Sequence, residues 1–317
     1  MTKRIAFLSA ILLFWVQAAR PASAGVSSIN GEGVSVRFDA PLLNAAKDIL
    51  KVYPAVRDEL AMDLGMGTDL RPEIVLIKDR ASFRKEAGSD LVTAYAIPGK
   101  DLIVIDYSKM GGHPYTVEVT LKHELCHLEL HHQIGQNGDG RMPRWFDEGI
   151  CQWVTGGFGE LIDGGDRSVL TSAVLSGRLL SIGRMTASFP SDGREMLLAY
   201  AESRSIVEYI EKTFGARAVR AVLDRMRGGD DLDAAISNSL HISSVELEKR
   251  WKASLSTKNA WLYYLRDNLY EILFMLGALF TVCGFFRALK RRREYKDDEE
   301  GGEKDEDGDG EETPPPP

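Results

Sequence analysis

Two histidines stand four positions apart in the segment HELCH, residues 123–127. Side chains four residues apart on an α-helix lie on the same face, one turn apart. The imidazoles of His123 and His127 can therefore share one Zn2+ ion, each nitrogen about 2.0–2.1 Å from it. Glu124 would lie beside such an ion, where its carboxylate can act as a general base toward water. The segment predicts a metal-dependent hydrolytic site, and two surface histidines on a solvated helix are the alternative.

The neighbouring residues favour a helix around this segment. Thr116 is suited to the N-cap position, and Gly135 is suited to the end of the helix. Between them lies an apolar stripe that can pack on the rest of the protein, formed by Leu121, Leu125 and Leu128. We therefore expect one helix to present both histidines on a single face.

A catalytic zinc site needs a third protein ligand and one open position. The segment PRWFDEGICQW, which begins at Pro143, predicts a second helix, because proline is favoured in the first helical turn. Gly149 would let this helix approach a neighbour closely. Glu148 flanks its apolar stripe and can point at the first helix. A carboxylate inside a packing interface needs a partner, and a metal ion supplies one.

An HExxH segment followed by P-x-W-F-x-E-G resembles the gluzincin metallopeptidases, particularly the peptidase-MA-like family related to thermolysin and the zinc aminopeptidases. The resemblance covers about residues 34–255 and implies a zincin-like fold. It also implies that His123, His127 and Glu148 bind zinc and that Glu124 is the general base. The substrate class that it implies is a peptide or a protein.

Details of the resemblance refine the expected activity. Tyr200 resembles a family tyrosine that can donate a hydrogen bond to a tetrahedral oxyanion, although a core tyrosine is an equal alternative. The Gly-x-Met-Glu-Asn segment by which the aminopeptidases recognise a free amino terminus is absent, which favours an endopeptidase. The metzincin pattern is excluded by Leu130 and Gln133. A degenerate fold serving as a membrane-tethered binding module is the rival function, yet all four metal and base positions are intact.

Other polar residues near the motifs have simpler explanations. We expect Asp147 to be a charge in the first turn of its helix, in preference to a partner of a metal ligand. His131 and His132 are expected to be ordinary charges near the end of the first helix. Cys126 and Cys151 are expected to be small buried thiols, with a disulfide as the alternative in an oxidising compartment.

The elements that would position these residues follow from the hydrophobic periodicity. The N-terminal part predicts strands with one helix among them, and the chain after residue 112 predicts mostly helices. This order predicts an α+β fold, a small N-terminal sheet joined to a helical C-terminal half. The expected strands are residues 34–38, 73–77, 93–97 and 102–107, and the expected helix is 41–62.

Both ends of the chain carry membrane-related signals. Residues 1–24 resemble a secretory signal peptide, with Lys3 and Arg4 before an apolar run and a small-residue cleavage site before Gly25. Residues 269–286 predict a transmembrane helix, followed by a basic cluster from Arg287 that favours a cytoplasmic C-terminus. For residues 1–24 the alternative is an uncleaved anchor or a buried helix. For residues 269–286 it is a short amphipathic or core helix.

These signals divide the chain into an exported metallopeptidase domain, residues 25–258, a membrane span and a cytoplasmic tail, residues 287–317. The tail is basic and then acidic, has little apolar surface to bury and is expected to be disordered. The formal net charge of the 317 residues is −8, and no basic stripe indicates nucleic-acid binding. Three cysteines do not make a disulfide framework.

Overall fold

The computed structural model describes residues 26–302 except 68, 89–91, 112–115, 136–141, 157–165, 256–264 and 266–267. For residues 166–168 and 292–302 it describes the backbone alone. The expected signal peptide and residues 303–317 lie outside the described part of the chain. The chain divides into two units: residues 1–166 with 180–251, and residues 167–179 with 252–317.

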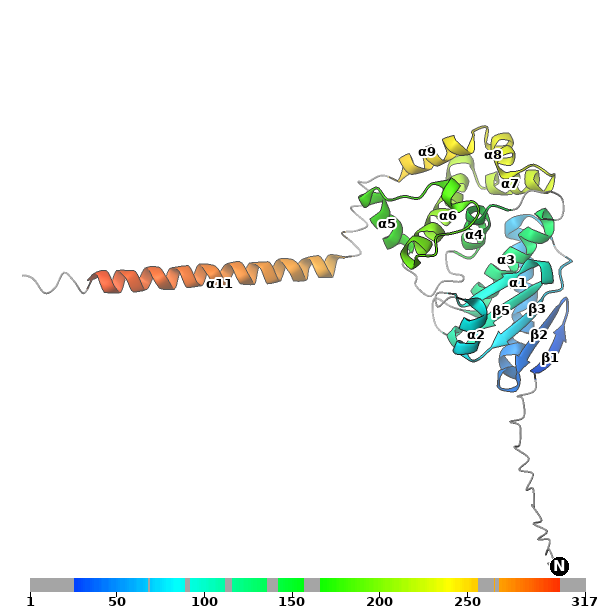
Figure 1. Ribbon diagram of the computed structural model, residues 1–317, viewed down its shortest axis with the longest axis horizontal. Coiled ribbons are helices and arrows are strands. Elements are labelled where there is room, and N and C mark those ends of the chain that lie inside the picture. The colour runs from blue at the N-terminus through cyan, green and yellow to red at the C-terminus, as the bar shows by residue number, and fades with distance from the viewer. Residues whose placement is uncertain are drawn as a thin grey trace, which may run out of the picture. The chain divides into compact units, whose positions relative to one another are not determined.

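The first unit contains a five-stranded sheet with the order β1-β2-β3-β5-β4 (Figure 1). Strands β2, β3 and β5 are parallel, whereas β1 and β4 pair antiparallel with their neighbours at the two edges. Alternate side chains of β2 are buried, as the period-two pattern predicts. The strands are β1 (Val26–Gly31), β2 (Val34–Asp39), β3 (Glu73–Ile77), β4 (Ala94–Ile97) and β5 (Leu102–Asp106).

Helices α1 (Leu43–Leu64) and α3 (Val117–Ile134) pack on this sheet and on each other. A short helical turn at Ala40–Leu42, which contains Pro41, leads into α1. Gly65 ends α1 with φ of +70°, a conformation that favours glycine. The short helix α2 (Arg80–Ala87) packs on β3 and buries Phe83.

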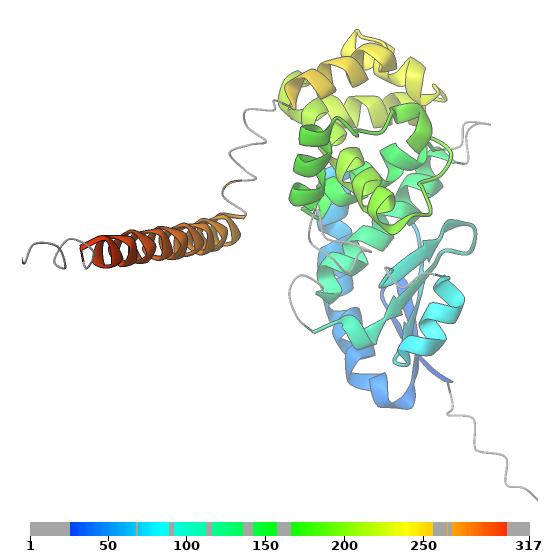
Figure 2. The ribbon, with the colours of Figure 1, turned by 60° about the vertical axis from the view of Figure 1, so that its left-hand side comes forward.

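The rest of the first unit is helical, which confirms the predicted α+β class with a small N-terminal sheet. Figure 2 shows α6 to α8, drawn in green to yellow, gathered at the end of this unit away from the sheet. A Cβ atom on Gly149 would lie 2.6 Å from the carbonyl oxygen of Ser203, so α4 and α6 meet backbone to backbone there. The helices are α4 (Arg144–Val154), α6 (Gly193–Phe214), α7 (Ala218–Arg227), α8 (Leu232–Leu240) and α9 (Ser244–Ser254).

The second unit contains most of α5 (Asp166–Ser176) and all of α11 (Leu269–Gly302). Within the described residues, Leu269–Arg291 is the helical segment whose length and mean hydropathy of 2.1 would allow it to cross a membrane. The helix continues beyond the segment that the sequence predicts, through the basic cluster to Gly302. Lysine, arginine and glutamate are good helix formers, so this charged stretch can continue the helix beyond the apolar segment.

Candidate metal centre

Helix α3 has the boundaries that its sequence predicts. The Thr116 side chain accepts a hydrogen bond from the Val119 backbone N–H at 3.3 Å, and the backbone N–H of Gly135 closes the last turn. The helix lies between the sheet and α4 and is buried from Thr120 to Leu130. His123 and Glu124 are fully buried, and His127 is 5 % exposed.

Helix α4 brings Glu148 to α3. Pro143 precedes the helix as its N-cap residue, and the Arg144 backbone N–H donates to the Thr186 carbonyl oxygen at 2.8 Å. The close approach at Gly149 fixes one face of α4 against α6. Glu148 is on the part of α4 that meets α3, and its side chain is fully buried.

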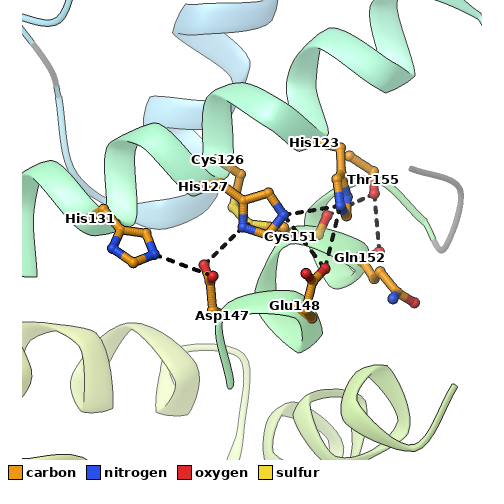
Figure 3. The surroundings of a disulfide bond; sticks show 9 residues. All are labelled: His123, Cys126, His127, His131, Asp147, Glu148, Cys151, Gln152 and Thr155. Carbon is orange, nitrogen blue, oxygen red and sulfur yellow. Dashed lines mark hydrogen bonds and ion pairs between the residues drawn. A yellow bond between two sulfur atoms is a disulfide. The ribbon is translucent and has the colours of Figure 1, made fainter. Parts of the chain in front are cut away.

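Three potential ligand atoms converge between α3 and α4 (Figure 3). The Nε2 atoms of His123 and His127 are 3.2 Å apart. Glu148 Oε2 lies 3.5 Å from His127 Nε2 and 3.7 Å from His123 Nε2. Tetrahedral ligands about 2.1 Å from one zinc ion would be separated by about 3.4 Å. The three atoms therefore fit a single ion, and the sequence predicts all three of them.

Asp147 lies in the first turn of α4, as the sequence predicts, but it is also a partner of His127, against the preference that the sequence gives. Asp147 Oδ1 lies 2.9 Å from His127 Nδ1, and Oδ2 lies 3.4 Å from His131 Nε2. A hydrogen bond from Nδ1–H to a carboxylate leaves the Nε2 lone pair of His127 directed at the ligand cluster. His131, expected to be an ordinary charge, also belongs to this chain of contacts.

These contacts shift the ionisation of the buried groups. Burial raises the pKa of the Asp147 carboxyl, but His127 and His131 outweigh it and lower that pKa to about 2. Burial disfavours the charged imidazole of His127, yet Asp147 and Glu148 raise its pKa well above the usual value. Asp147 is therefore a carboxylate at neutral pH, able to accept a hydrogen bond from His127 Nδ1–H.

Replacing Asp147 with Asn should weaken zinc binding about 10–100-fold, the usual effect of removing a carboxylate that orients a metal-bound histidine. Asparagine keeps the shape but not the charge that holds the His127 tautomer. Competition with a chromogenic chelator at fixed pH measures the affinity. Asp224→Asn is a suitable control, because the Asp224 side chain is 63 % exposed and outside the cluster. Equal zinc affinities in the two variants would show that Asp147 does not support metal binding.

Cys126 and Cys151 form a disulfide between α3 and α4, which corrects the expectation of two free thiols. Their Cα atoms are 5.5 Å apart, within the usual range for a disulfide. Cys151 Sγ also lies 3.5 Å from His127 Nδ1. The bond therefore joins the two ligand-bearing helices directly beside the ligand cluster (Figure 3).

The two predicted catalytic residues differ in what surrounds them. Glu124 lies on α3 next to His123 and is fully buried. The hydroxyl of Tyr200, on α6, lies 3.5 Å from Glu148 Oε1. Tyr200 is thus brought to the edge of the ligand cluster from a helix distant in sequence.

Comparison with known proteins bears on the same segment. Residues 108–257 match the family model of the Peptidase MA superfamily. The resemblance predicted from the HELCH and E-G motifs is thereby confirmed. The matched segment contains α3, α4 and α6, and hence every predicted site residue.

Other comparisons are less informative. No curated protein matches the chain. Among solved structures, yeast LTA4 hydrolase in complex with Bestatin is similar over 68 % of this chain and 36 % of that chain, with 12 % identity and a TM-score of 0.45. The chain thus spans about a third of the length of that protein, and the likeness carries no information on activity.

Proposed function

We propose that this protein is a membrane-anchored, zinc-dependent peptidase, with endopeptidase activity toward peptide or protein substrates. The observation that carries the proposal is the convergence of His123, His127 and Glu148 ligand atoms within 3.2–3.7 Å. This convergence lies in a segment that matches the Peptidase MA superfamily. Three buried protein ligands from two helices are the donor set of a catalytic zinc site with one open position.

The proposed mechanism uses the three metal ligands and three further residues. His123, His127 and Glu148 would hold the zinc ion, with Asp147 orienting His127. When bound there, zinc supplies a Lewis acid that polarises a carbonyl and lowers the pKa of water toward about 7.

Glu124 accepts the proton of the attacking water and returns it to the leaving amine. Glu124 is positioned for this role beside His123 on α3. Tyr200 donates a hydrogen bond from its hydroxyl group to the oxyanion that forms during attack.

The sheet offers a place for an extended substrate. Strand β4 lies at an edge of the sheet, whereas β5 lies inside it, so β4 is the strand beside α3 that could pair with a peptide backbone. Helix α3 packs against β4, which puts this edge and the ligand-bearing helix in one region. A cavity of about 450 Å³ beyond the end of β4 is lined by three polar residues, two glycines and a proline: Asp101, His131, His132, Gly99, Gly135 and Pro98. We assign β4 to the substrate backbone.

We place the catalytic domain, residues 25–258, on the outer side of the membrane, with residues 1–24 removed as a signal peptide. Helix α11 would cross the bilayer, and Arg287 and the basic residues after it would lie on the cytoplasmic side. The Cys126–Cys151 disulfide supports this location, because such bonds persist mainly in oxidising compartments.

The test combines metal content with peptide cleavage in the full chain purified in detergent. We expect about one zinc ion per chain and cleavage of internal bonds in a mixed peptide library read by mass spectrometry. A chelator should abolish cleavage, and added zinc should restore it. A well-folded protein without zinc would contradict the proposal and favour a binding module. Cleavage confined to terminal residues would contradict the endopeptidase assignment.

A further inference from the structure

Arg144 contacts the oxygen of Glu148 that does not face the histidines. Arg144 lies one helical turn before Glu148 on α4, and its Nη2 atom lies 2.5 Å from Glu148 Oε1. The other oxygen, Oε2, is the one directed at His123 and His127. The two carboxylate oxygens of Glu148 therefore have different partners. Oε1 contacts the guanidinium, and Oε2 faces the two histidines.

The guanidinium is itself held in place by aromatic side chains. Arg144 Nη2 lies 3.4 Å from the Tyr200 hydroxyl, which in turn lies 3.5 Å from Glu148 Oε1. The guanidinium carbon lies 5.7 Å from the centre of the Phe189 ring. Phe189 packs edge to face on Tyr200, with ring centres 4.9 Å apart. Arg144 thus has contacts from α4, α6 and the segment before α6.

We propose that Arg144 is a positioning residue of the metal centre, which holds Glu148 Oε1 so that Oε2 alone is presented to the metal. This inference rests on the proposed role of Glu148 as a ligand. The terminal torsion of a glutamate is broad, so a carboxylate held at one end only can rotate. A forked, permanently charged donor on Oε1 restricts that rotation.

The burial of Glu148 makes this contact more than a surface ion pair. The Glu148 side chain is fully buried, whereas the Arg144 side chain is 43 % exposed. A carboxylate removed from water loses its solvation, and a charged partner is needed to compensate for that loss. Arg144 supplies that charge from a position partly in solvent, where its own loss of hydration is smaller.

An i,i+4 ion pair could instead serve only to stabilise α4. The two roles have different consequences. A stabilising pair changes the melting temperature of the metal-free protein and leaves the affinity for zinc unchanged. A positioning residue changes the affinity for zinc and the geometry of the bound metal.

The experiment compares three variants of the full chain, with zinc alone as the probe. Arg144→Met removes the charge and keeps most of the side-chain length. Arg144→Lys keeps the charge and loses the fork. Arg184→Met is the matched control, because Arg184 forms a surface ion pair with Glu195, at 57 % and 49 % side-chain exposure. Zinc affinity is measured by chelator competition, and metal-free melting is measured in parallel.

We expect Arg144→Met to weaken zinc binding about 10–100-fold, Arg144→Lys to weaken it less, and Arg184→Met to leave it unchanged. The visible spectrum of the cobalt-loaded protein should change in Arg144→Met, because a released carboxylate alters the coordination geometry. Wild-type affinity and an unchanged cobalt spectrum in Arg144→Met would overturn the inference. If that variant does not fold, wild-type affinity in Arg144→Lys would overturn it. Absence of zinc from the wild type would instead overturn the proposed function, and this inference with it.

Discussion

The Glu124→Gln variant should retain about one zinc ion per chain and lose peptide hydrolysis by about 10²–10⁴-fold, the usual contribution of a general base. Glutamine has the shape of glutamate, but its amide cannot accept the proton of the attacking water. Glu124 is fully buried on α3 and does not belong to the cluster of three ligand atoms. The variant should therefore separate proton transfer from metal binding.

Glu118→Gln provides the matched control for this experiment. Glu118 lies in the first turn of the same helix and is exposed, so the same chemical change there should leave both zinc content and turnover unchanged. Unchanged turnover in Glu124→Gln would remove Glu124 from the mechanism. Loss of zinc from Glu124→Gln would show that Glu124 is needed to hold the metal.

The His123→Ala variant should lose zinc, with an affinity lowered by more than the roughly 100-fold that follows loss of a supporting residue. His123 Nε2 is one of the three converging atoms, and the two that remain would leave the ion with half of a tetrahedral set. Hydrolysis should fall with the zinc content. Metal analysis after dialysis against a weak chelator, together with the peptide assay, measures both effects.

His241→Asn is the control that removes a histidine elsewhere. His241 is exposed at the end of α8 with φ of +56°, a conformation that asparagine tolerates. Circular dichroism of both variants is needed, because His123 is buried and its truncation leaves a cavity. Full zinc content in a folded His123→Ala protein would contradict the proposed ligand set.

Strong local patterns were sufficient to predict much of the fold. The Thr116 cap and Gly135 end gave the limits of α3, and the apolar run at 73–77 gave β3. The edge strand β1 carries mostly exposed residues and is defined by its pairing with β2. Helix α2 buries little besides Phe83 and has no apolar stripe to reveal it. Elements without a buried face leave no periodic signal in one sequence.

The metal centre, too, could be predicted only in part from the sequence. The four-residue spacing of His123 and His127 is set within one helix, so the sequence predicts it. The Asp147 contact and the Cys126–Cys151 bond depend on the rotation of α4 relative to α3. That rotation is fixed by packing, notably the close approach of Gly149 to Ser203, which a single sequence does not specify. The sequence shows that Asp147 is acidic, but it does not show that the side chain points at His127.

The disulfide has a consequence for how the metal is acquired. It closes a loop with a sequence separation of 25, and that loop contains both His127 and Glu148. Closing a loop of this size removes about 3.5 kcal/mol of chain entropy from the unfolded state. Two ligands from separate helices are therefore kept at high effective concentration even when the ion is absent. An oxidised chain that loses its metal would keep these ligands close together and could bind the ion again without refolding.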